Sequence, residues 1–263
     1  MMDGFLNYTM LAGVGLVAGA FNTVAGGGSF LTLPFLMVLG LPATEANGTN
    51  RLAVILQSLT AFWEFRRSSG RRDGDREGNG NEMARRLAVI ATIPTILGSL
   101  LGAWISLAVG DQAFKKILSI LMVAVTVWTL WDPVGKKKIS LRAPESRYGA
   151  THALLFLLVG LYGGFVQAGV GFLILAVTTY SGLDLVRGNA VKVFSVLLLT
   201  GVSLVFFAWH GTIDWSVGLA LGAGSSAGGL LGARLSVRIG ATWIQRIVIA
   251  AVFLFAIVLW ISD

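Results

Sequence analysis

The chain has 263 residues, of which 55 % are apolar and 13 % are charged, and its mean hydropathy is +0.78. These values exclude an ordinary soluble domain and indicate a membrane protein. The lack of cysteine excludes disulfides, thiolate metal sites and cysteine nucleophiles. The net charge of +7 comes from Lys and Arg gathered in short loops, which is typical of membrane topology and not of a nucleic-acid partner.

Eight apolar segments are long enough to cross a hydrocarbon layer, which takes about 20 helical residues. In chain order they are 5–25, 46–65, 87–109, 113–131, 149–166, 188–209, 213–236 and 243–261. Two more, 29–41 and 170–183, are too short, because thirteen helical residues reach only about 20 Å. We therefore predict an all-α polytopic membrane protein with eight long transmembrane helices and two broken half-helices.

Hydrophilic stretches divide the chain. No Lys or Arg precedes the first apolar segment, so we expect it to be retained and not cleaved as a signal peptide. The stretch 66–86 is predicted to be a solvated cytoplasmic loop, and 132–148 a cytoplasmic linker. The predicted domains are a first membrane repeat over 1–131, the linker, and a second membrane repeat over 149–263.

An internal repeat relates the two halves. Three blocks align: Gly40-Leu41 and Ala46-Asn47 with Gly182-Leu183 and Gly188-Asn189 at a shift of 142 residues, Gly26-x-Gly28 with Gly169-x-Gly171 at 143, and the segment 97–103 with 227–233 at 130. The shift falls because the first half carries the longer loop. Each half therefore consists of five apolar segments, of which the second is short and the other four are long.

The distribution of basic residues predicts the orientation of the repeats. If the short segments cross the membrane, only Arg51, Lys115 and Lys116 of the 20 Lys and Arg lie on the outer side. If they re-enter instead, five further basic residues join them there: Arg187, Lys192, Arg234, Arg238 and Arg246. The positive-inside rule favours the first arrangement, which is an inverted pair of five-segment halves with both termini outside.

Inverted repeats with broken helices are typical of secondary transporters, and the N-termini of helices favour anions. We therefore predict an anionic substrate bound where the short helices begin, at Gly26, Gly27, Gly28, Gly169 and Gly171. Close helix packing is the alternative for any membrane glycine. It is the favoured interpretation for a second set inside the long segments, namely Gly98, Gly102, Gly228, Gly229 and Gly232.

Polar side chains near the breaks complete the predicted substrate site. Arg51 and Lys192 lie in the first turns of two matching long helices, where a cation is unfavourable unless an anion is near, although Lys192 could equally be an interfacial anchor. Asn47 and Asn189 open the same helices, as caps, as donors to the anion, or as both. Asn22 and Gln167 are amides within apolar runs, as is Gln57, and interhelical hydrogen bonding is the alternative for each.

Nothing in the sequence identifies a coupling ion or a catalyst. No carboxylate lies deep in a predicted span, so the coupling and direction of transport stay open, and a passive anion channel is an alternative. With two histidines, no cysteine and no H-E-x-x-H motif, we expect no enzyme, no catalytic residue, no metal and no cofactor. A non-transporting assembly subunit is less favoured, because it would not need matched helix breaks. Whether the chain forms a homodimer is left open.

The order and spacing of three segments resemble one known family. They are AGGGSFLTLPFLMVLGLPATEANGTNRL in the first half, and GLYGGFVQAGVGFLILAVTTYSGLDLVRGNAVK followed by GGLLGARLSVRI in the second. Together they are similar to the sulfite exporter TauE/SafE family of membrane permeases. The resemblance implies transport of small anions, such as sulfite or sulfonates like sulfoacetate, across the cell inner membrane.

Overall fold

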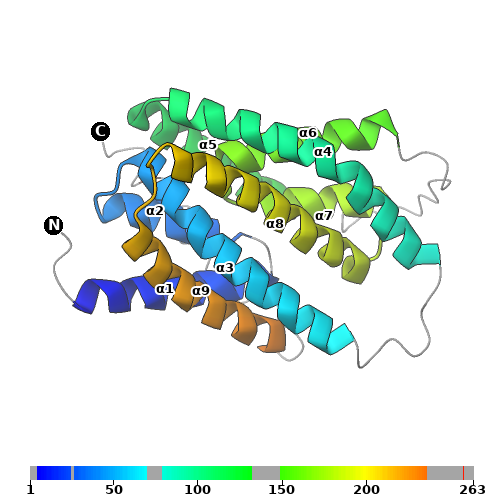
Figure 1. Cartoon of the computed structure of the whole chain (residues 1–263), viewed down its shortest axis with the longest axis horizontal. Coiled ribbons are helices and arrows are strands. Elements are labelled where there is room, and N and C mark those ends of the chain that lie inside the picture. Colours follow the sequence, from blue (N-terminus) through cyan, green and yellow to red (C-terminus); the bar gives the residue numbers. More distant parts are fainter. Residues whose placement is uncertain (1–4, 25–26, 70–78, 132–148, 236–256, 258–263) are drawn as a thin grey trace.

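A computed structural model describes residues 5–24, 27–69, 79–131, 149–235 and 257 of the chain. All regular secondary structure among these residues is helical, so the predicted all-α class is confirmed for them. The helices, labelled in Figure 1, are α1 Phe5–Val24, α2 Ser29–Val38, α3 Ala43–Ser69, α4 Asn79–Ala108, α5 Asp111–Trp131, α6 Ala150–Phe165, α7 Val170–Tyr180, α8 Leu185–Trp209 and α9 Trp215–Leu235.

The helices follow the predicted segments closely, with one difference in the first half. Helix α3 continues to Ser69 and α4 begins at Asn79, so both enter the stretch 66–86 that was predicted to be a loop. That prediction is wrong for these ends, because Arg and Glu are good helix formers and a helix can continue into water. The linker 132–148 lies outside the described residues, as does nearly all of the last predicted span, 243–261.

The two short helices end in the same hydrogen-bond pattern. Gly40 after α2 has φ +96° and Gly182 after α7 has φ +84°, a backbone conformation that glycine adopts without strain. After α2, the N–H groups of residues 39, 40 and 41 donate to the carbonyl oxygens of residues 35, 37 and 36, respectively. After α7, the N–H groups of residues 181, 182 and 183 donate in the same way to the carbonyl oxygens of residues 177, 179 and 178. The repeated Gly-Leu pair is therefore the stop signal of each short helix, a Schellman motif.

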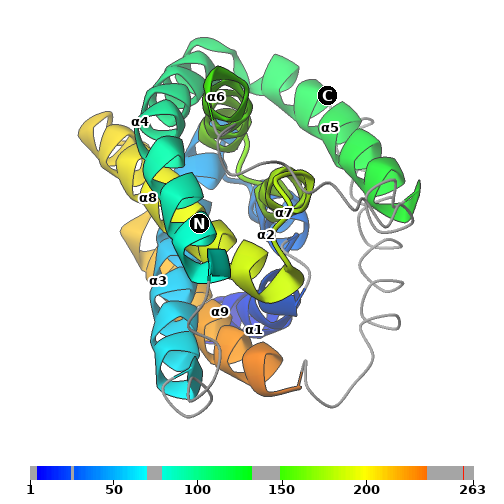
Figure 2. The ribbon, with the colours of Figure 1, turned by 90° about the vertical axis from the view of Figure 1, so that its right-hand side faces the viewer.

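The short helices lie in the middle of the bundle. Figure 2 shows α2 and α7 near the centre, with α1, α3, α4, α6, α8 and α9 arranged around them. Helix α1 packs along α9, and α6 packs along α4. Since the sequence repeat matches α1 with α6 and α4 with α9, the first helix of each half packs against the fourth helix of the other. The two halves are thus interleaved.

Glycine allows this interleaving because the backbones touch. A Cβ added at Gly98 of α4 would lie 2.2 Å from the carbonyl oxygen of Leu157, and one added at Gly228 of α9 would lie 1.9 Å from that of Leu16. Such distances forbid a side chain without movement of a helix. The packing interpretation is confirmed for Gly98, Gly102, Gly228 and Gly232, whereas Gly229 faces the side chain of Gln57 at 3.1 Å.

The glycine contacts also give the directions of the helices. Helices α1 and α9 run parallel, because Ala12 contacts Gly224 and, further along both helices, Ala20 contacts Gly232. Helices α3 and α9 also run parallel, since Leu52 contacts Gly218 and Leu56 contacts Gly222. Helices α1 and α3 therefore point the same way, and the chain returns between them through α2. Helices α3 and α8 run antiparallel, with Gly48 against Phe207 and Ile55 against Gly201.

The outer surface of the bundle is apolar. On α4, Val89, Ile93, Leu97 and Trp104 are 66 %, 68 %, 56 % and 60 % exposed. A soluble monomer rarely exposes so continuous an apolar stripe, whereas lipid covers it at no cost. Among the described helices, 81–108 and 187–209 are long and apolar enough to cross a membrane, with hydropathies of 1.9 and 2.2.

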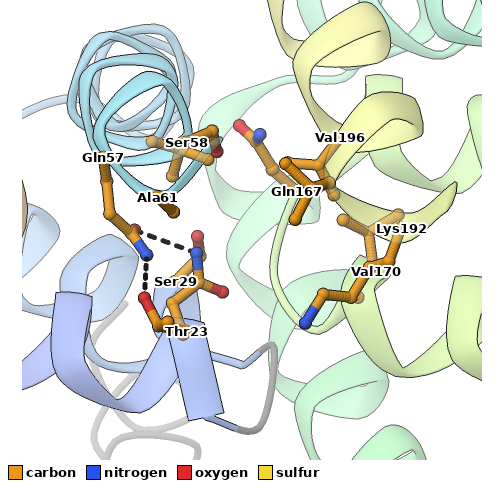
Figure 3. Close-up of a pocket in the computed structure, with 13 residues that line it drawn as sticks. Thr23, Ser29, Gln57, Ser58, Ala61, Gln167, Val170, Lys192 and Val196 are labelled. Atoms are coloured by element: carbon orange, nitrogen blue, oxygen red, sulfur yellow. Dashed lines mark hydrogen bonds between the residues drawn. The ribbon is translucent and has the colours of Figure 1, made fainter. Parts of the chain in front are cut away.

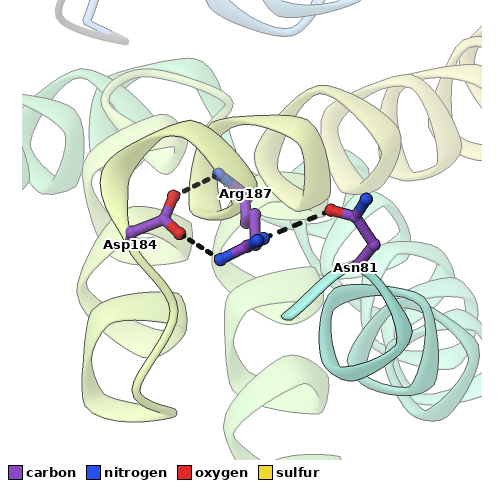
Figure 4. Close-up of polar contacts among 3 residues, drawn as sticks. All are labelled: Asn81, Asp184 and Arg187. Atoms are coloured by element: carbon purple, nitrogen blue, oxygen red, sulfur yellow. Dashed lines mark hydrogen bonds and ion pairs between the residues drawn. The ribbon is translucent and has the colours of Figure 1, made fainter. Parts of the chain in front are cut away.

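A polar contact joins the halves at one end of the bundle. The Arg187 side chain, at the start of α8, donates to Asp184 Oδ2 at 2.7 Å and to Asn81 Oδ1 of α4 at 3.2 Å (Figure 4). Arg187 N–H donates to Asp184 Oδ1 at 2.9 Å. The Asp184 side chain is 50 % exposed, so this ion pair contributes little stability and mainly orients the start of α8 against α4.

Candidate functional site

A partly open pocket lies among α1, α2, α3, α7 and α8 (Figure 3), and its empty space, open solvent included, is about 510 Å³. We call it the central pocket. It draws residues from both halves of the chain. They are Asn22, Thr23, Ser29, Val54, Gln57, Ser58, Ala61, Gln167, Val170, Gly171, Lys192, Val193 and Val196.

Both short helices begin at the central pocket. Ser29 is the first residue of α2, and Val170 and Gly171 are the first two of α7, and all three line it. The first N–H groups of a helix have no intrahelical acceptor, and the helix dipole is positive there. Two helix N-termini from different halves therefore give the pocket a positive polarity.

The glycine breaks place these N-termini. Gly169 precedes α7 with φ +73°, a left-handed turn that other residues adopt with strain. A Cβ on Gly28 would lie 2.2 Å from the carbonyl oxygen of Ala18, and one on Gly27 would lie 2.7 Å from the Phe172 ring. The three glycines act through the backbone path, whereas Gly171 lines the pocket itself. Gly26 lies outside the described residues.

Lys192 of α8 supplies a buried cation to the central pocket. The residue is 5 % exposed, and within the described part of the chain its Nζ has no hydrogen bond or ion pair. Figure 3 shows the side chain reaching past Val170 toward the side where Ser29 and Thr23 lie. A desolvated ammonium with three unused donors is a strong attractor for an anion.

Amide side chains line the opposite side. Asn22 Nδ2 donates to Gln57 Oε1 at 2.9 Å, and Gln57 Nε2 donates to Thr23 Oγ1 and to the Gly19 carbonyl oxygen, each at 3.2 Å. The Gly28 N–H donates to Asn22 Oδ1 at 3.4 Å. This network joins α1 to α3 and fixes the turn before α2.

Gln167 lines the central pocket from the segment that precedes α7. Its Nε2 donates to Thr200 Oγ1, and its buried Oε1 has no partner among the described residues. Because a hydroxyl can donate or accept, half a turn of the amide would present the NH₂ group to the pocket and keep the bond to Thr200. Gln167 can thus serve a ligand as acceptor or as donor.

Arg51 lies outside the pocket lining, and both of its terminal nitrogens are hydrogen-bonded within the protein, whereas its buried Nε has no partner among the described residues. It is 0 % exposed, and its guanidinium donates to the carbonyl oxygens of Gly163 and Gly164 at the end of α6 and, at 2.8 Å, to Ser203 Oγ. Its Cζ stands 4.7 Å from the centre of the Phe207 ring. A cation at a helix C-terminus is favourable, so the anion that the sequence seemed to require at Arg51 is replaced by backbone carbonyls.

The two asparagines that match in the repeat, Asn47 and Asn189, also have different surroundings. Asn47 is 0 % exposed, and its Nδ2 donates to Ser106 Oγ at 2.9 Å and to the Phe165 carbonyl oxygen at 2.8 Å. Its Oδ1 accepts from Arg51 at 3.4 Å. Asn189 is half-buried and does not line the central pocket. Of the predicted site residues, the structure brings Asn22, Gln167, Gly171 and Lys192 into the pocket lining.

Three polar lining residues were not singled out from the sequence, Thr23, Ser29 and Ser58, and Gln57 was noted only as an amide within an apolar run. A signal for them was present. Ser29 follows the glycine break directly, and Val54, Gln57, Ser58 and Ala61 have the spacing of one face of a helix. The face could not be assigned to a pocket before its neighbours were known.

One sequence pattern associated with catalysis lies among the described residues. Residues 224–228 fit the pattern G-x-S-x-G, but they lie inside α9 and pack against α1, whereas a nucleophile elbow needs a sharp strand-to-helix turn. Within the described residues, no group of His, Asp and Glu could hold a metal ion.

These features define a membrane transporter, and comparison with known proteins gives the family. The chain matches the sulfite exporter TauE/SafE family over residues 11–259 and belongs to it. It is 30 % identical over 246 residues to a probable membrane transporter protein of Haemophilus influenzae, covering 92 % of this chain and 89 % of the relative.

Other relatives have similar names. The chain is 30 % identical over 240 residues to the probable membrane transporter protein YfcA of Escherichia coli K12, with 90 % and 83 % of the two chains covered. It is 26 % identical over 243 residues to the probable membrane transporter protein ORF9 of a Sinorhizobium species, with 92 % and 87 % covered. No solved structure gives a significant match.

Proposed function

We propose that this protein moves small anions, sulfite or organosulfur anions such as sulfonates, across the inner membrane by alternating access, without enzymatic activity. The observation that carries the proposal is Lys192, a buried cation in the central pocket with no partner among the described residues. Family membership supports transport, and the pocket chemistry supports an anion.

Several features of the central pocket favour an oxyanion. Lys192 supplies charge, the starts of α2 and α7 supply N–H donors, and Ser29 and Ser58 supply hydroxyls. These groups converge from three or more directions, as the oxygens of a tetrahedral or pyramidal sulfur group require. The Thr23 hydroxyl is not among them, because it donates to the Gly19 carbonyl oxygen at 3.0 Å instead. Val170, Val193 and Val196 form an apolar side that fits the short carbon chain of a sulfonate.

The helix directions support alternating access by inverted halves. Helices α3 and α8 match in the repeat yet run antiparallel, and the chain returns through α2 between the parallel helices α1 and α3. Both features agree with short segments that complete a crossing. The central pocket takes α1, α2 and α3 from one half and α7 and α8 from the other, so rocking of the halves would open it to alternate sides.

Binding is tested by thermal unfolding of the detergent-purified protein with sulfite, sulfate, thiosulfate, methanesulfonate and sulfoacetate. A ligand at about 100 times its Kd stabilises the folded state by roughly 2.7 kcal/mol. We expect at least one sulfur oxyanion to raise the Tm of the wild type and of Lys115→Met, a control on α5 away from the pocket. Lys192→Met should lose this shift, and an equal shift in Lys192→Met would contradict the site.

Flux into proteoliposomes then separates a transporter from a passive channel. A transporter saturates with substrate and exchanges internal for external anion, whereas a channel passes anions in proportion to their gradient. Saturable uptake that Lys192→Met abolishes supports the proposal. Uptake of no sulfur oxyanion at all would refute it.

Topology is tested by labelling single cysteines, since the chain has none of its own. His210 follows α8 and Arg85 lies near the start of α4, and both are exposed. Inverted five-segment halves place position 210 outside and position 85 in the cytoplasm. A membrane-impermeant maleimide should therefore label His210→Cys but not Arg85→Cys in intact cells, and labelling of 210 only after lysis would exclude this topology.

A further inference from the structure

We propose that Lys192 couples proton movement to anion transport, so that each anion crosses together with one proton. This inference rests on the proposed function and adds the coupling ion. It starts from a geometric fact: a side chain that is 5 % exposed lines a partly open pocket, and its Nζ has no partner among the described residues.

Among the described residues, no charged side chain pairs with Lys192. Among the residues that line the central pocket, from α1, α2, α3, α7, α8 and the segment before α7, Lys192 alone is ionisable. The other described ionisable side chains on helices that pack against α8 do not line the pocket. They are Glu45, Arg51, Glu82, Arg85, Arg86, His152, Tyr162 and Tyr180.

Four of these eight groups bind other parts of the chain. Arg51 is bound to the carbonyl oxygens that end α6, and Tyr162 donates to the Ala168 carbonyl oxygen at 2.6 Å. Glu82 pairs with Arg86 near the exposed start of α4. The described residues thus supply no counter-charge for Lys192, and in our proposal the anionic ligand supplies it.

Charge balance limits the states in which the pocket can close. An ammonium enclosed without an anion is strongly unfavourable in a low-dielectric environment, and so is an anion enclosed beside a neutral amine. Two closed states remain: the ammonium with its anion, or the neutral amine with an empty pocket. Anion and proton therefore cross together, and the carrier returns with neither.

The chemical balance of one cycle is simple. On one side the amine takes up a proton to form an ammonium, which binds the anion. On the other side the anion leaves and the ammonium releases the same proton, which restores the amine. One proton and one anion cross, so a monovalent anion moves without net charge, and a divalent anion carries one negative charge across.

The contrast with Arg51 supports the assignment of proton exchange to Lys192. A guanidinium keeps its proton in proteins, and Arg51 is held permanently by acceptors of the chain. A lysine can exchange its proton, and the group that can do so is the one placed in the pocket.

The experiment uses the full-length protein in proteoliposomes that contain a pH-sensitive dye, with radiolabelled methanesulfonate, sulfoacetate and sulfite outside. The sulfonate groups have no proton to exchange near neutral pH, so any change of lumen pH reports the protein. We expect uptake of a transported sulfonate to acidify the lumen of wild-type vesicles, and an outside-acid pH gradient to accelerate uptake. For sulfite, acidification is compared with Lys192→Gln vesicles loaded to the same content.

Two variants assign the proton to Lys192. Lys192→Arg keeps a fixed positive charge, so it should still exchange internal for external anion, but its net uptake should be at least about tenfold slower because the empty carrier would have to close around an unpaired charge. Lys192→Gln carries no proton, and its residual anion flux should leave the lumen pH unchanged. Lys115→Arg on α5 serves as the matched control and should behave as wild type.

The outcomes separate this inference from the proposed function. If the wild type moves neither sulfite nor any sulfonate, the proposed function fails and the coupling fails with it. If the wild type moves them while the lumen pH stays constant, or only exchanges them, anion transport stands and proton coupling is overturned. If Lys192→Gln still moves protons at the wild-type ratio to anion, the assignment to Lys192 is overturned.

Discussion

Arg51 and Lys192 lie at nearly matching positions of the two halves, in the third turns of α3 and α8, yet their surroundings are opposite. Arg51 is 0 % exposed and reaches across to α6 and α8, where carbonyl oxygens and Ser203 accept hydrogen bonds from its two terminal nitrogens. Lys192 is 5 % exposed and faces the central pocket with no partner among the described residues. A repeated backbone thus supports a structural cation in one half and a ligand-binding cation in the other.

The largest expected effect tests this contrast through stability. Arg51→Ala leaves several buried carbonyl oxygens without a donor and opens a space beside Phe207, so we expect it to lower the free energy of unfolding by about 3 kcal/mol or more. Lys192→Met removes a buried amine that has no partner among the described residues and should leave the stability equal or higher. Unfolding of both variants in detergent without ligand measures this. Equal losses would mean that Lys192 has a structural partner.

A second prediction concerns two matching glycines whose substitution should have the same effect on stability in both halves. Gly98 and Gly228 match in the repeat, and each would place a Cβ within 2.2 Å of a carbonyl oxygen of the neighbouring helix. We expect Gly98→Ala and Gly228→Ala to destabilise the protein by similar amounts, about 1–3 kcal/mol each, through overpacking. Gly13→Ala is the matched control, since its Cβ would meet nothing within 4 Å. Widely different losses of stability would show that one of the two helix interfaces moves apart to accept the added methyl group.

The smallest expected effect separates the matched asparagines. Asn47→Ala loses hydrogen bonds to Ser106 and to the Phe165 carbonyl oxygen and should cost about 1–2 kcal/mol of stability. Asn189→Ala removes a half-buried side chain outside the pocket lining and should change stability by about 0.5 kcal/mol or less. Thermal unfolding of both variants measures these two changes in stability. A loss of anion binding in Asn189→Ala, with stability intact, would return this residue to the binding site.

Much of the secondary structure could be predicted from the sequence. Apolar runs, glycine breaks and the repeated Gly-Leu pairs located the helices α1 to α9, because each signal acts within a few residues of the helix that it begins or ends. The error at 66–86 has the same origin. Charged residues leave the membrane but keep their helix propensity, so polarity marked the end of the apolar segment and not the end of the helix.

The site was less predictable. Lys192, Asn22, Gln167 and Gly171 were expected and line the central pocket, because polar or glycine residues in apolar runs stand out locally. Arg51 stood out for the same reason, but its partners Gly163 and Ser203 are 112 and 152 residues away in the chain. A local pattern cannot tell a cation that awaits a ligand from one that the fold already satisfies.

The sequence by itself determined the membrane class, the helices with their glycine breaks, and the family, since these depend on local composition, spacing and order. Only the tertiary structure decided which groups face one another: the starts of α2 and α7 meet at one pocket, Lys192 enters it, and Arg51 is turned toward the end of α6. The physical reason is that partners for a buried polar group come from helices far apart in the chain. Whether such a group is free to bind depends on how those helices pack.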